Sequence, residues 1–147
     1  NIGNLIANVI QEQKSKFAKH KQKVVFKKPK KTLVVFADIT KLRMVLENIV
    51  DNAGKYSPPG TTITIRATSS RGKVNIAVID KGVGMPKKDI HKVFEKFVRL
   101  DNPLSKIVGG SGLGLYWGQK IIDLHGGEIT VSSELGTGTT FTITLPT

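Results

Sequence analysis

Residues 39–56 read ITKLRMVLENIVDNAGKY, and this stretch carries the strongest helix signal in the sequence. Its apolar side chains recur at positions 42, 45, 46, 49, 50 and 53, which is the spacing of one face of an α-helix. Asp38, just before the stretch, is suited to cap the start of a helix, and Ser57-Pro58-Pro59-Gly60 behind it must end one. The pattern therefore predicts a helix over residues 39–56 with one buried face.

Shorter patterns on both sides predict the remaining elements. Leu5, Ile6, Val9, Ile10 and Phe17 indicate an amphipathic N-terminal helix, and Leu113, Trp117, Ile121 and Leu124 indicate the buried face of a late helix. A short helical stretch is expected at 90–97 and a mobile loop at 99–112. Strands are expected at 24–26, 32–36, 62–67, 74–79, 128–133 and 139–145, the first two joined by a Lys-Pro-Lys-Lys turn. Helices that alternate with paired strands predict one α/β domain over 1–147, a mixed sheet covered by helices on one face.

The composition excludes several classes of protein. The chain has 147 residues and no cysteine, so a disulfide framework and a thiolate metal site are excluded. The longest apolar run, residues 33–37, is far shorter than the roughly 20 residues of a membrane span. The chain opens at Asn1 without a methionine or a secretory signal pattern, and we therefore expect a piece of a longer protein.

The formal net charge of +12 is concentrated in one segment. Residues 14–31 hold nine lysines and no acid, which leaves 14 basic and 11 acidic residues elsewhere. Two interpretations stay open: a solvated helix end and hairpin, or a docking surface for anionic lipid, an acidic protein or nucleic acid. Only Phe17 and Phe26 interleave with these lysines, so a platform for stacking bases is poorly supported.

The polar face of the 39–56 helix could bind a metal and phosphates. At about 100° per residue, Asn48, Asn52 and Lys55 fall within roughly 60° of one another. Amide oxygens are hard ligands and a lysine supplies positive charge. The same residues could also form an ordinary solvated face.

Two glycine-bearing stretches could hold a nucleotide. In Asp80-Lys81-Gly82-Val83-Gly84, a carboxylate at a strand end can accept a hydrogen bond from an exocyclic amino group such as that of adenine, and glycines allow close approach of a flat ligand. In GGSGLGL (109–115), glycines at a helix start expose backbone N–H groups to phosphates. The alternatives are an ordinary turn and a flexible linker. The second stretch fits neither the dinucleotide fingerprint nor the phosphate-binding loop motif.

In this order, the motifs resemble those of the ATP-binding catalytic domain of sensor histidine kinases, over nearly the whole chain. The N box of that family is similar to LENIVDNAGKY (46–56), its first glycine box to DKGVG (80–84), its F box to FEKF (94–97) and its second glycine box to GSGLG (110–114). LHGG (124–127) and GTTF (138–141) resemble its usual ending. The resemblance implies a Bergerat-type fold, a two-layer α/β sandwich that binds ATP and Mg²⁺.

The resemblance also implies roles for residues of the helix and of the first glycine box. Asn52 would be the Mg²⁺ ligand, Asn48 and Lys55 would lie at the phosphates and act in catalysis, and Tyr56 would border the nucleotide. Asp80 would bind the adenine amino group with support from Thr139. The adenine pocket would be shaped by Gly82 and Gly84.

Further roles are implied for the loop that would close over ATP. Arg99 would reach the γ-phosphate and act in catalysis, and Lys106 would be a second contact from the body of this lid. The lid would be anchored and the nucleotide contacted by Gly110, Gly112, Leu113 and Gly114.

One spacing distinguishes phosphoryl transfer from hydrolysis. In the hydrolysing relatives, namely gyrase-like topoisomerases, mismatch-repair proteins and heat-shock chaperones, a glutamate stands one helical turn before the metal-binding asparagine. Here that residue is Asn48, and an amide cannot act as a general base at neutral pH. Glu47 lies about 140° around the helix from Asn52. The pattern favours a domain that presents ATP to another nucleophile.

The resemblance implies that this nucleophile is a histidine followed by Glu or Asp. His20, His91 and His125 are followed by Lys or Gly. We expect His20 and His91 to face solvent and His125 to cap or pack the end of the late helix. The acceptor would then lie on a dimerisation domain of the same protein, and the isolated chain would not autophosphorylate.

The expected setting is the cytoplasmic part of a bacterial sensor kinase that signals to a response regulator, without nucleic acid as a partner and without insertion of this domain in a membrane. Two alternatives stay open. One is a serine kinase of the anti-sigma type, or another ATPase, on the same fold. The other is a nucleic-acid-binding module that uses residues 14–31.

Overall fold

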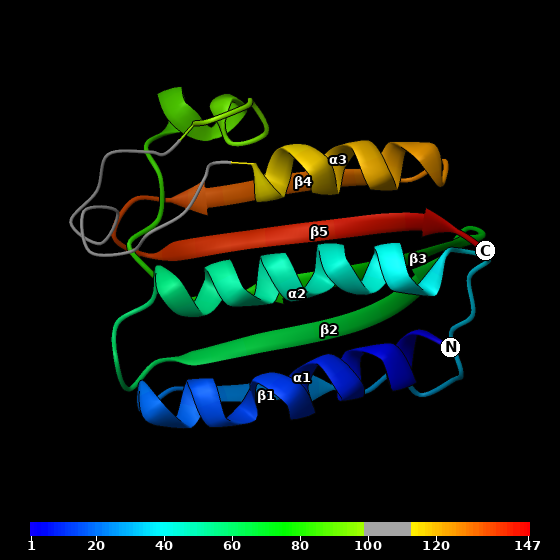
Figure 1. Ribbon diagram of the computed structural model, residues 1–147, viewed down its shortest axis with the longest axis horizontal. Coiled ribbons are helices and arrows are strands. Elements are labelled where there is room, and N and C mark those ends of the chain that lie inside the picture. Colours follow the sequence, from blue (N-terminus) through cyan, green and yellow to red (C-terminus); the bar gives the residue numbers. More distant parts are fainter. Residues whose placement is uncertain (99–112) are drawn as a thin grey trace.

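The computed structural model describes residues 1–98 and 113–147, and these form a mixed sheet with three α-helices on one face (Figure 1). The five strands lie in the order β1-β2-β3-β5-β4. They are β1 (Lys23–Lys27), β2 (Thr62–Ser70), β3 (Lys73–Ile79), β4 (Glu128–Glu134) and β5 (Gly138–Pro146). β1 runs parallel to β2, and the other neighbours are antiparallel. The predicted mixed sheet with helices on one face is confirmed.

The helices are α1 (Ile2–Lys19), α2 (Ile39–Lys55) and α3 (Gly114–Leu124), and a 3₁₀ helix, η1, covers Lys87–Lys92. Asp38 caps α2 as predicted, because its carboxylate accepts a hydrogen bond from the backbone N–H of Lys41 at 3.0 Å. α2 ends at Lys55, and its C-cap residue Tyr56 precedes the Ser-Pro-Pro-Gly segment. In the part of the chain that the structure describes, no helix is long and apolar enough to cross a membrane.

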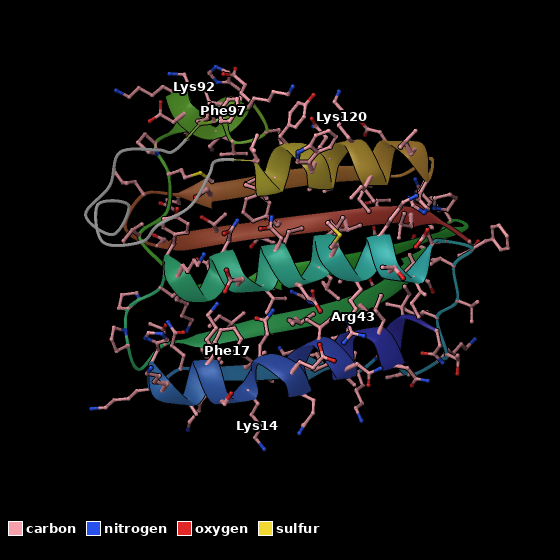
Figure 2. All side chains as sticks on the ribbon, viewed as in Figure 1. Lys14, Phe17, Arg43, Lys92, Phe97 and Lys120 are labelled. Atoms are coloured by element: carbon pink, nitrogen blue, oxygen red, sulfur yellow. The ribbon has the colours of Figure 1, made fainter. Side chains whose placement is uncertain are left out.

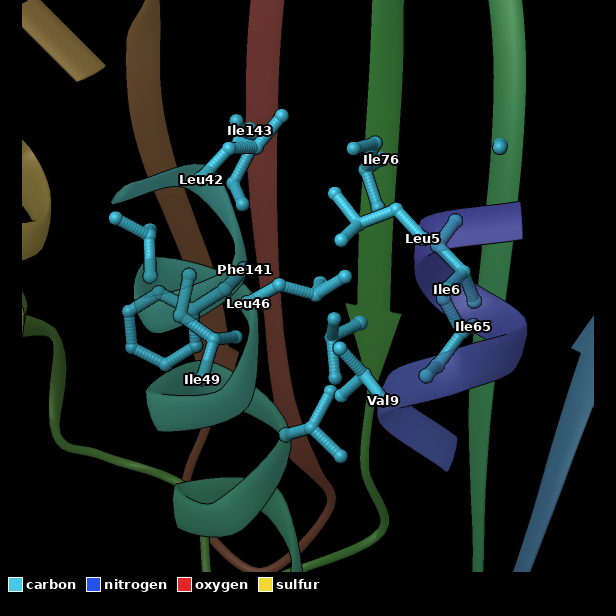
Figure 3. Close-up of a cluster of buried hydrophobic side chains, with 14 of the residues drawn as sticks. Leu5, Ile6, Val9, Leu42, Leu46, Ile49, Ile65, Ile76, Phe141 and Ile143 are labelled. Atoms are coloured by element: carbon cyan, nitrogen blue, oxygen red, sulfur yellow. The ribbon is translucent and has the colours of Figure 1, made fainter. Parts of the chain in front are cut away.

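A hydrophobic core fills the space between the helices and the sheet (Figure 3). Strand residues alternate between the two faces, so that Ile65, Ile76 and Ile143 point to the helices while Thr64, Asn75 and Thr142 lie on the opposite face. From the helices, the core receives Leu5, Ile6 and Val9 of α1 and Leu42, Leu46 and Ile49 of α2. In Figure 2, Lys14 extends from α1 on the side away from α2.

The predicted strand at 32–36 is wrong. β1 is an edge strand, and its one neighbour among the described strands is β2, with which it pairs in parallel. The chain between two parallel strands must cross over the face of the sheet. Residues 28–38 therefore form the connection into α2. Leu33 ties this connection to α1, because its side chain is buried and its carbonyl accepts a hydrogen bond from the N–H of Ile2 at 2.9 Å.

Two helix predictions need correction. The expected helix at 90–97 is a 3₁₀ helix at Lys87–Lys92, and Phe97, with a φ of 60°, cannot continue a right-handed helix. α3 is where it was predicted, but its buried face is formed by Gly118 and Ile122. Trp117 and Leu124 of the predicted face are 53% and 85% exposed.

His125 joins the end of α3 to the start of α2, as its predicted packing role requires. Its Nδ1 lies 2.7 Å from the carbonyl oxygen of Ile121, and its Nε2 accepts a hydrogen bond from the N–H of Asp38 at 3.0 Å. These partners assign the proton to Nδ1. His20 and His91 are exposed, as predicted.

Candidate functional site

A cavity of about 80 Å³ opens where the end of α2, the start of α3 and the adjoining ends of β3 and β5 meet. This volume is several times the space that one water molecule needs. Five residues singled out in the sequence line it together: Asn52, Tyr56, Asp80, Gly84 and Thr139. They come from three separate stretches of the sequence, which the fold brings to one end of the molecule (Figure 1).

The sheet register places Asp80 beside Thr139. Ile79 of β3 pairs with Thr140 of β5, so the next residue along β3 faces the residue before Thr140. Oδ1 of Asp80 accepts hydrogen bonds from the backbone N–H groups of Thr139, at 3.1 Å, and Gly82, at 2.8 Å. No hydrogen bond from the described residues reaches Oδ2. One carboxylate oxygen thus holds the loop, and the other is free to accept from a ligand.

Burial raises the pKa of Asp80 from 3.8 to about 6, and the hydrogen bonds from Gly82 and Thr139 only partly oppose this rise. The carboxylate is 8% exposed and has no cation among these partners. A buried, unpaired carboxylate in a cavity is a common sign of a functional site. At neutral pH the group is still mostly ionised and therefore accepts hydrogen bonds without donating one.

Backbone contacts hold the loop that follows Asp80. The N–H of Val83 donates to the carbonyl of Tyr56 at 3.1 Å, and the carbonyl of Val83 accepts from Gly136 at 2.8 Å. Gly84 has a φ of 67°, and a Cβ on it would overlap the carbonyl oxygen of Glu134. A larger residue at Gly84 would therefore push the loop away from the β4–β5 turn.

Ser133 is a site residue that sequence reasoning missed. Its hydroxyl accepts from the N–H of Met85 at 2.9 Å, donates to the carbonyl of Gly138 at 3.1 Å and lies 2.7 Å from Oγ1 of Thr139. It thus connects the glycine loop to the residue that holds Asp80. A serine on a strand carries no local signal of such a role, so only the register reveals it.

Apolar side chains form most of the cavity wall. They are Ala53, Val83, Met85, Val93, Leu115 and Phe141. Phe94, from the FEKF stretch, packs edge-on against Phe141 with 6.3 Å between ring centroids, whereas Phe97 is 70% exposed. Apolar walls with one polar anchor suit a flat ring that carries a hydrogen-bond donor.

Asn52 is the cavity residue whose chemistry suits a divalent cation. Its amide oxygen is a hard ligand, and no hydrogen bond within the described ranges occupies its side chain. No group of three or more His, Asp or Glu residues in those ranges could form a metal site by itself. Mg²⁺ commonly binds through one or two side chains plus phosphate oxygens and water, so Asn52 fits such a site next to a bound polyphosphate.

Asn48 lies outside this cavity, in the adjoining groove that Leu113 and Gly114 also line. A Cβ on Gly114 would overlap the amide of Asn48, so a larger residue here would displace that side chain. Nδ2 of Asn48 is buried without a hydrogen-bond partner in the described part of the chain. This donor is available to a group that enters between α2 and α3.

Lys55 is held in an ion-pair network beside the cavity. Its Nζ lies 3.0 Å from Oδ2 of Asp51, whose Oδ1 pairs with Lys16 of α1. Burial raises the pKa of Asp51, but hydrogen bonds from Lys16 and Lys55 outweigh this effect and lower the pKa below its usual value. Lys55 is not part of the cavity wall, so the structure does not bring it together with Asn52 and Asp80 as the sequence led us to expect.

Glu47 does not line the cavity, in agreement with its predicted position about 140° around the helix from Asn52. Its Oε1 accepts a hydrogen bond from Nε of Arg43 at 2.9 Å, and it lines the groove rather than the cavity. Figure 2 shows Arg43 between α1 and α2. Four further predicted site residues lie outside the described residues: Arg99, Lys106, Gly110 and Gly112.

Comparisons with known proteins agree with this geometry. Residues 37–147 match the family described as histidine kinase-, DNA gyrase B-, and HSP90-like ATPase. The sensor histidine kinase WalK of Bacillus subtilis is 43% identical over 120 residues, which is 80% of this chain and 20% of WalK. This chain thus spans about a fifth of the length of that relative.

Solved structures give the same result. The catalytic domain of the histidine kinase ThkA superposes with a TM-score of 0.86 and 30% identity, over 99% of this chain and 92% of that one. Full-length ShkA in complex with AMPPNP superposes with a TM-score of 0.88 and 26% identity, over 99% of this chain and 30% of that one. ThkA in complex with the response regulator protein TrrA superposes with a TM-score of 0.83 and 28% identity, over 99% of this chain and 40% of that one.

Proposed function

This chain belongs to the histidine kinase-, DNA gyrase B-, and HSP90-like ATPase family, as a catalytic ATP-binding domain of the sensor histidine kinase type, and we propose that it binds ATP with Mg²⁺ and presents the γ-phosphate to a histidine. In this proposal residues 1–147 form one domain of a longer kinase. The acceptor histidine lies on a dimerisation domain outside these residues.

The proposal depends mainly on the hydrogen bonding and the surroundings of the Asp80 carboxylate. Its Oδ1 accepts hydrogen bonds from the backbone N–H groups of Gly82 and Thr139, and its Oδ2 has no hydrogen-bond partner among the described residues. Apolar side chains form most of the cavity wall around this carboxylate. An adenine ring would bury its faces against that wall and donate its exocyclic amino group to Oδ2. The AMPPNP complex of ShkA, which shares the fold, supports the assignment of an adenine nucleotide.

The phosphates would extend from this cavity toward the start of α3. Asn52 would hold Mg²⁺ through its amide oxygen, and the free Nδ2 of Asn48 would donate to a phosphate oxygen. When bound, Mg²⁺ neutralises phosphate charge and fixes the orientation of the chain of phosphates. Lys55 would contact phosphate only after leaving Asp51. Roles for Leu113 and Gly114, and for the lid residues outside the described ranges, stay part of the proposal.

Transfer to a protein side chain is favoured over hydrolysis. Asn48 cannot take a proton from water at neutral pH, and Glu47 is bonded to Arg43 outside the cavity. The domain then contributes mainly position and electrostatic stabilisation, and the nucleophile comes from its partner.

The relatives indicate the pathway in which this reaction would operate. WalK is a sensor histidine kinase, and the ThkA structure contains a response regulator. We infer that the longer protein passes its phosphoryl group to a response regulator and that this domain acts in the cytoplasm, where ATP is available.

Calorimetric titration with ATP, with and without Mg²⁺, tests the binding step. We expect saturable binding that Mg²⁺ strengthens and that Asp80→Asn weakens on the order of 100-fold, while Glu47→Gln, a matched change outside the cavity, leaves binding intact. The absence of binding heat with Mg²⁺ present at any nucleotide concentration would refute the proposal.

Incubation with radiolabelled ATP and the dimerisation domain tests the transfer step. We expect acid-labile, alkali-stable label on that domain, as for phosphohistidine. Acid-stable label would instead indicate a serine kinase on the same fold.

A further inference from the structure

Large apolar side chains are exposed at the end of the molecule opposite the cavity. Phe36 is 100% exposed, Ile39 69%, Val34 58% and Leu124 85%. The first three lie in or beside the connection that leads into α2, and Leu124 ends α3. The hydrogen bond between Asp38 and His125 brings these two segments together. Apolar side chains gathered at one place on a surface usually mark an interaction site.

Exposed lysines adjoin these apolar side chains along the same connection. They are Lys27, Lys28, Lys30 and Lys31, and no acidic residue lies between positions 14 and 37. Lys28, Lys30 and Lys31 surround a hollow of about 270 Å³ beside the start of α1. Asp38, the nearest acid in the sequence, forms an exposed ion pair with Lys41, whose Nζ lies 3.6 Å from the Asp38 carboxylate. We call the four apolar side chains and these four lysines the end face.

The end face points away from the nucleotide. It contains the start of α2 and the end of α3, whereas the cavity contains the end of α2 and the start of α3 (Figure 1). α2, with 17 residues, separates the two by about 25 Å. A partner at the end face would therefore leave the cavity open.

We propose that the end face docks onto a bilayer surface that contains anionic lipid. Its apolar side chains come from a loop and two helix ends, so they offer no groove and no single helix face for a protein segment. A bilayer requires no such complementarity: apolar side chains enter the headgroup region, and lysines gain from the negative surface potential. The inference goes beyond the proposed function and does not depend on it.

Sedimentation with vesicles tests the proposal. The 147-residue chain is mixed with vesicles of phosphatidylcholine alone or of equal parts phosphatidylcholine and phosphatidylglycerol. We expect binding to the anionic vesicles only, weakened by salt. A lysine near such a surface contributes about fivefold in affinity, so Lys28→Gln/Lys30→Gln/Lys31→Gln should lose on the order of 100-fold.

Matched variants distinguish docking by this face from attraction of a basic protein in any orientation. Lys14→Gln/Lys19→Gln/Lys21→Gln removes the same charge from exposed positions toward the other end of α1 and should lose far less affinity. Phe36→Ser should lose about tenfold in affinity for the vesicles. Leu135→Ser changes another exposed apolar side chain, on the β4–β5 turn and 62% exposed, and should leave this affinity unchanged. The thermal midpoint of each variant reports folding independently of ATP binding.

Three results would overturn the proposal: equal losses for the two lysine variants, unchanged binding of Phe36→Ser, or equal binding to both kinds of vesicle. Self-association that Phe36→Ser abolishes, without vesicle binding, would assign the end face to a second copy of the chain. Binding of inorganic phosphate in the lysine hollow without vesicle binding would reduce it to an anion site.

Discussion

Replacing Asp80 with asparagine should stabilise the protein and abolish adenine recognition at the same time. Both backbone hydrogen bonds to Asp80 end on Oδ1, and the amide oxygen of asparagine can accept both. The amide nitrogen then takes the place of Oδ2, where a donor replaces an acceptor. The loop keeps its anchors, and the cavity loses its charge.

The size of the stabilisation follows from the pKa of Asp80. The pKa rises from 3.8 to about 6 in the folded protein, so the folded state binds the proton more tightly than the unfolded state. The contribution of Asp80 to the free energy of unfolding is therefore greatest below pH 3.8 and decreases as the pH rises toward 6. At about pH 8 the charged side chain costs about 3 kcal/mol, and at about pH 4 only about 0.5 kcal/mol.

Thermal unfolding of the two proteins measures this difference. At about pH 8, Asp80→Asn should unfold about 6–12 °C higher than the wild type, and at about pH 4 the two midpoints should nearly coincide. A lower midpoint for the variant at about pH 8, or a difference that does not change with pH, would refute the assigned cause of the pKa shift.

Calorimetry on the same variant measures the loss of recognition. ATP would bring its amino group against the new amide donor and should bind on the order of 100-fold more weakly. The same substitution should reduce the affinity for inosine triphosphate, which carries a carbonyl at that ring position, much less. Equal losses for both nucleotides would contradict the role of Oδ2.

Other predictions follow from the same contacts. The affinity of the wild type for ATP should decrease as the pH falls through about 6, because protonated Asp80 no longer accepts freely; calorimetry at several pH values measures this, and a flat profile would contradict it. Ser133→Ala should weaken ATP binding severalfold, because three hydrogen bonds beside the cavity are lost, with thermal unfolding as the control for folding. Gly114→Ala should displace the amide of Asn48 and lower the free energy of unfolding by about 1–3 kcal/mol, measured by urea titration; an unchanged midpoint would show that α3 moves freely. His125→Ala should cost about 1–2 kcal/mol of stability with no change in ATP affinity, and reduced ATP affinity would contradict the separation of that end from the cavity.

The local part of the fold was predictable from the sequence because it depends on spacing. The apolar period of residues 42–53 predicts α2, and Asp38 and the Ser-Pro-Pro-Gly segment predict its ends. The four strands on either side of Gly72 and Gly136 were also predicted from the sequence. The error at residues 32–36 arose because apolar residues next to a turn suit a hairpin, whereas the parallel pairing of β1 with β2 depends on contacts far away in the sequence.

The site was only partly predictable. The motifs indicated Asn52, Asp80 and Thr139, and the fold brings these residues to one cavity. The i,i+4 spacing of Asp51 and Lys55 is compatible with an ion pair, but the sequence could not show that Lys16 of α1 joins it, because that contact depends on how α1 packs against α2. The error at Trp117 has a similar cause, since helical spacing describes a periodic stripe but not which neighbour covers it.

A crystal structure of the protein with AMPPNP and Mg²⁺ would show whether Asp80 and Asn52 bind the nucleotide and the metal. We expect the adenine ring between the apolar walls of the cavity, with its amino group about 2.8–3.1 Å from Oδ2 of Asp80 and the metal on the amide oxygen of Asn52. A nucleotide bound elsewhere, or an adenine whose amino group has no contact with Asp80, would contradict this expectation.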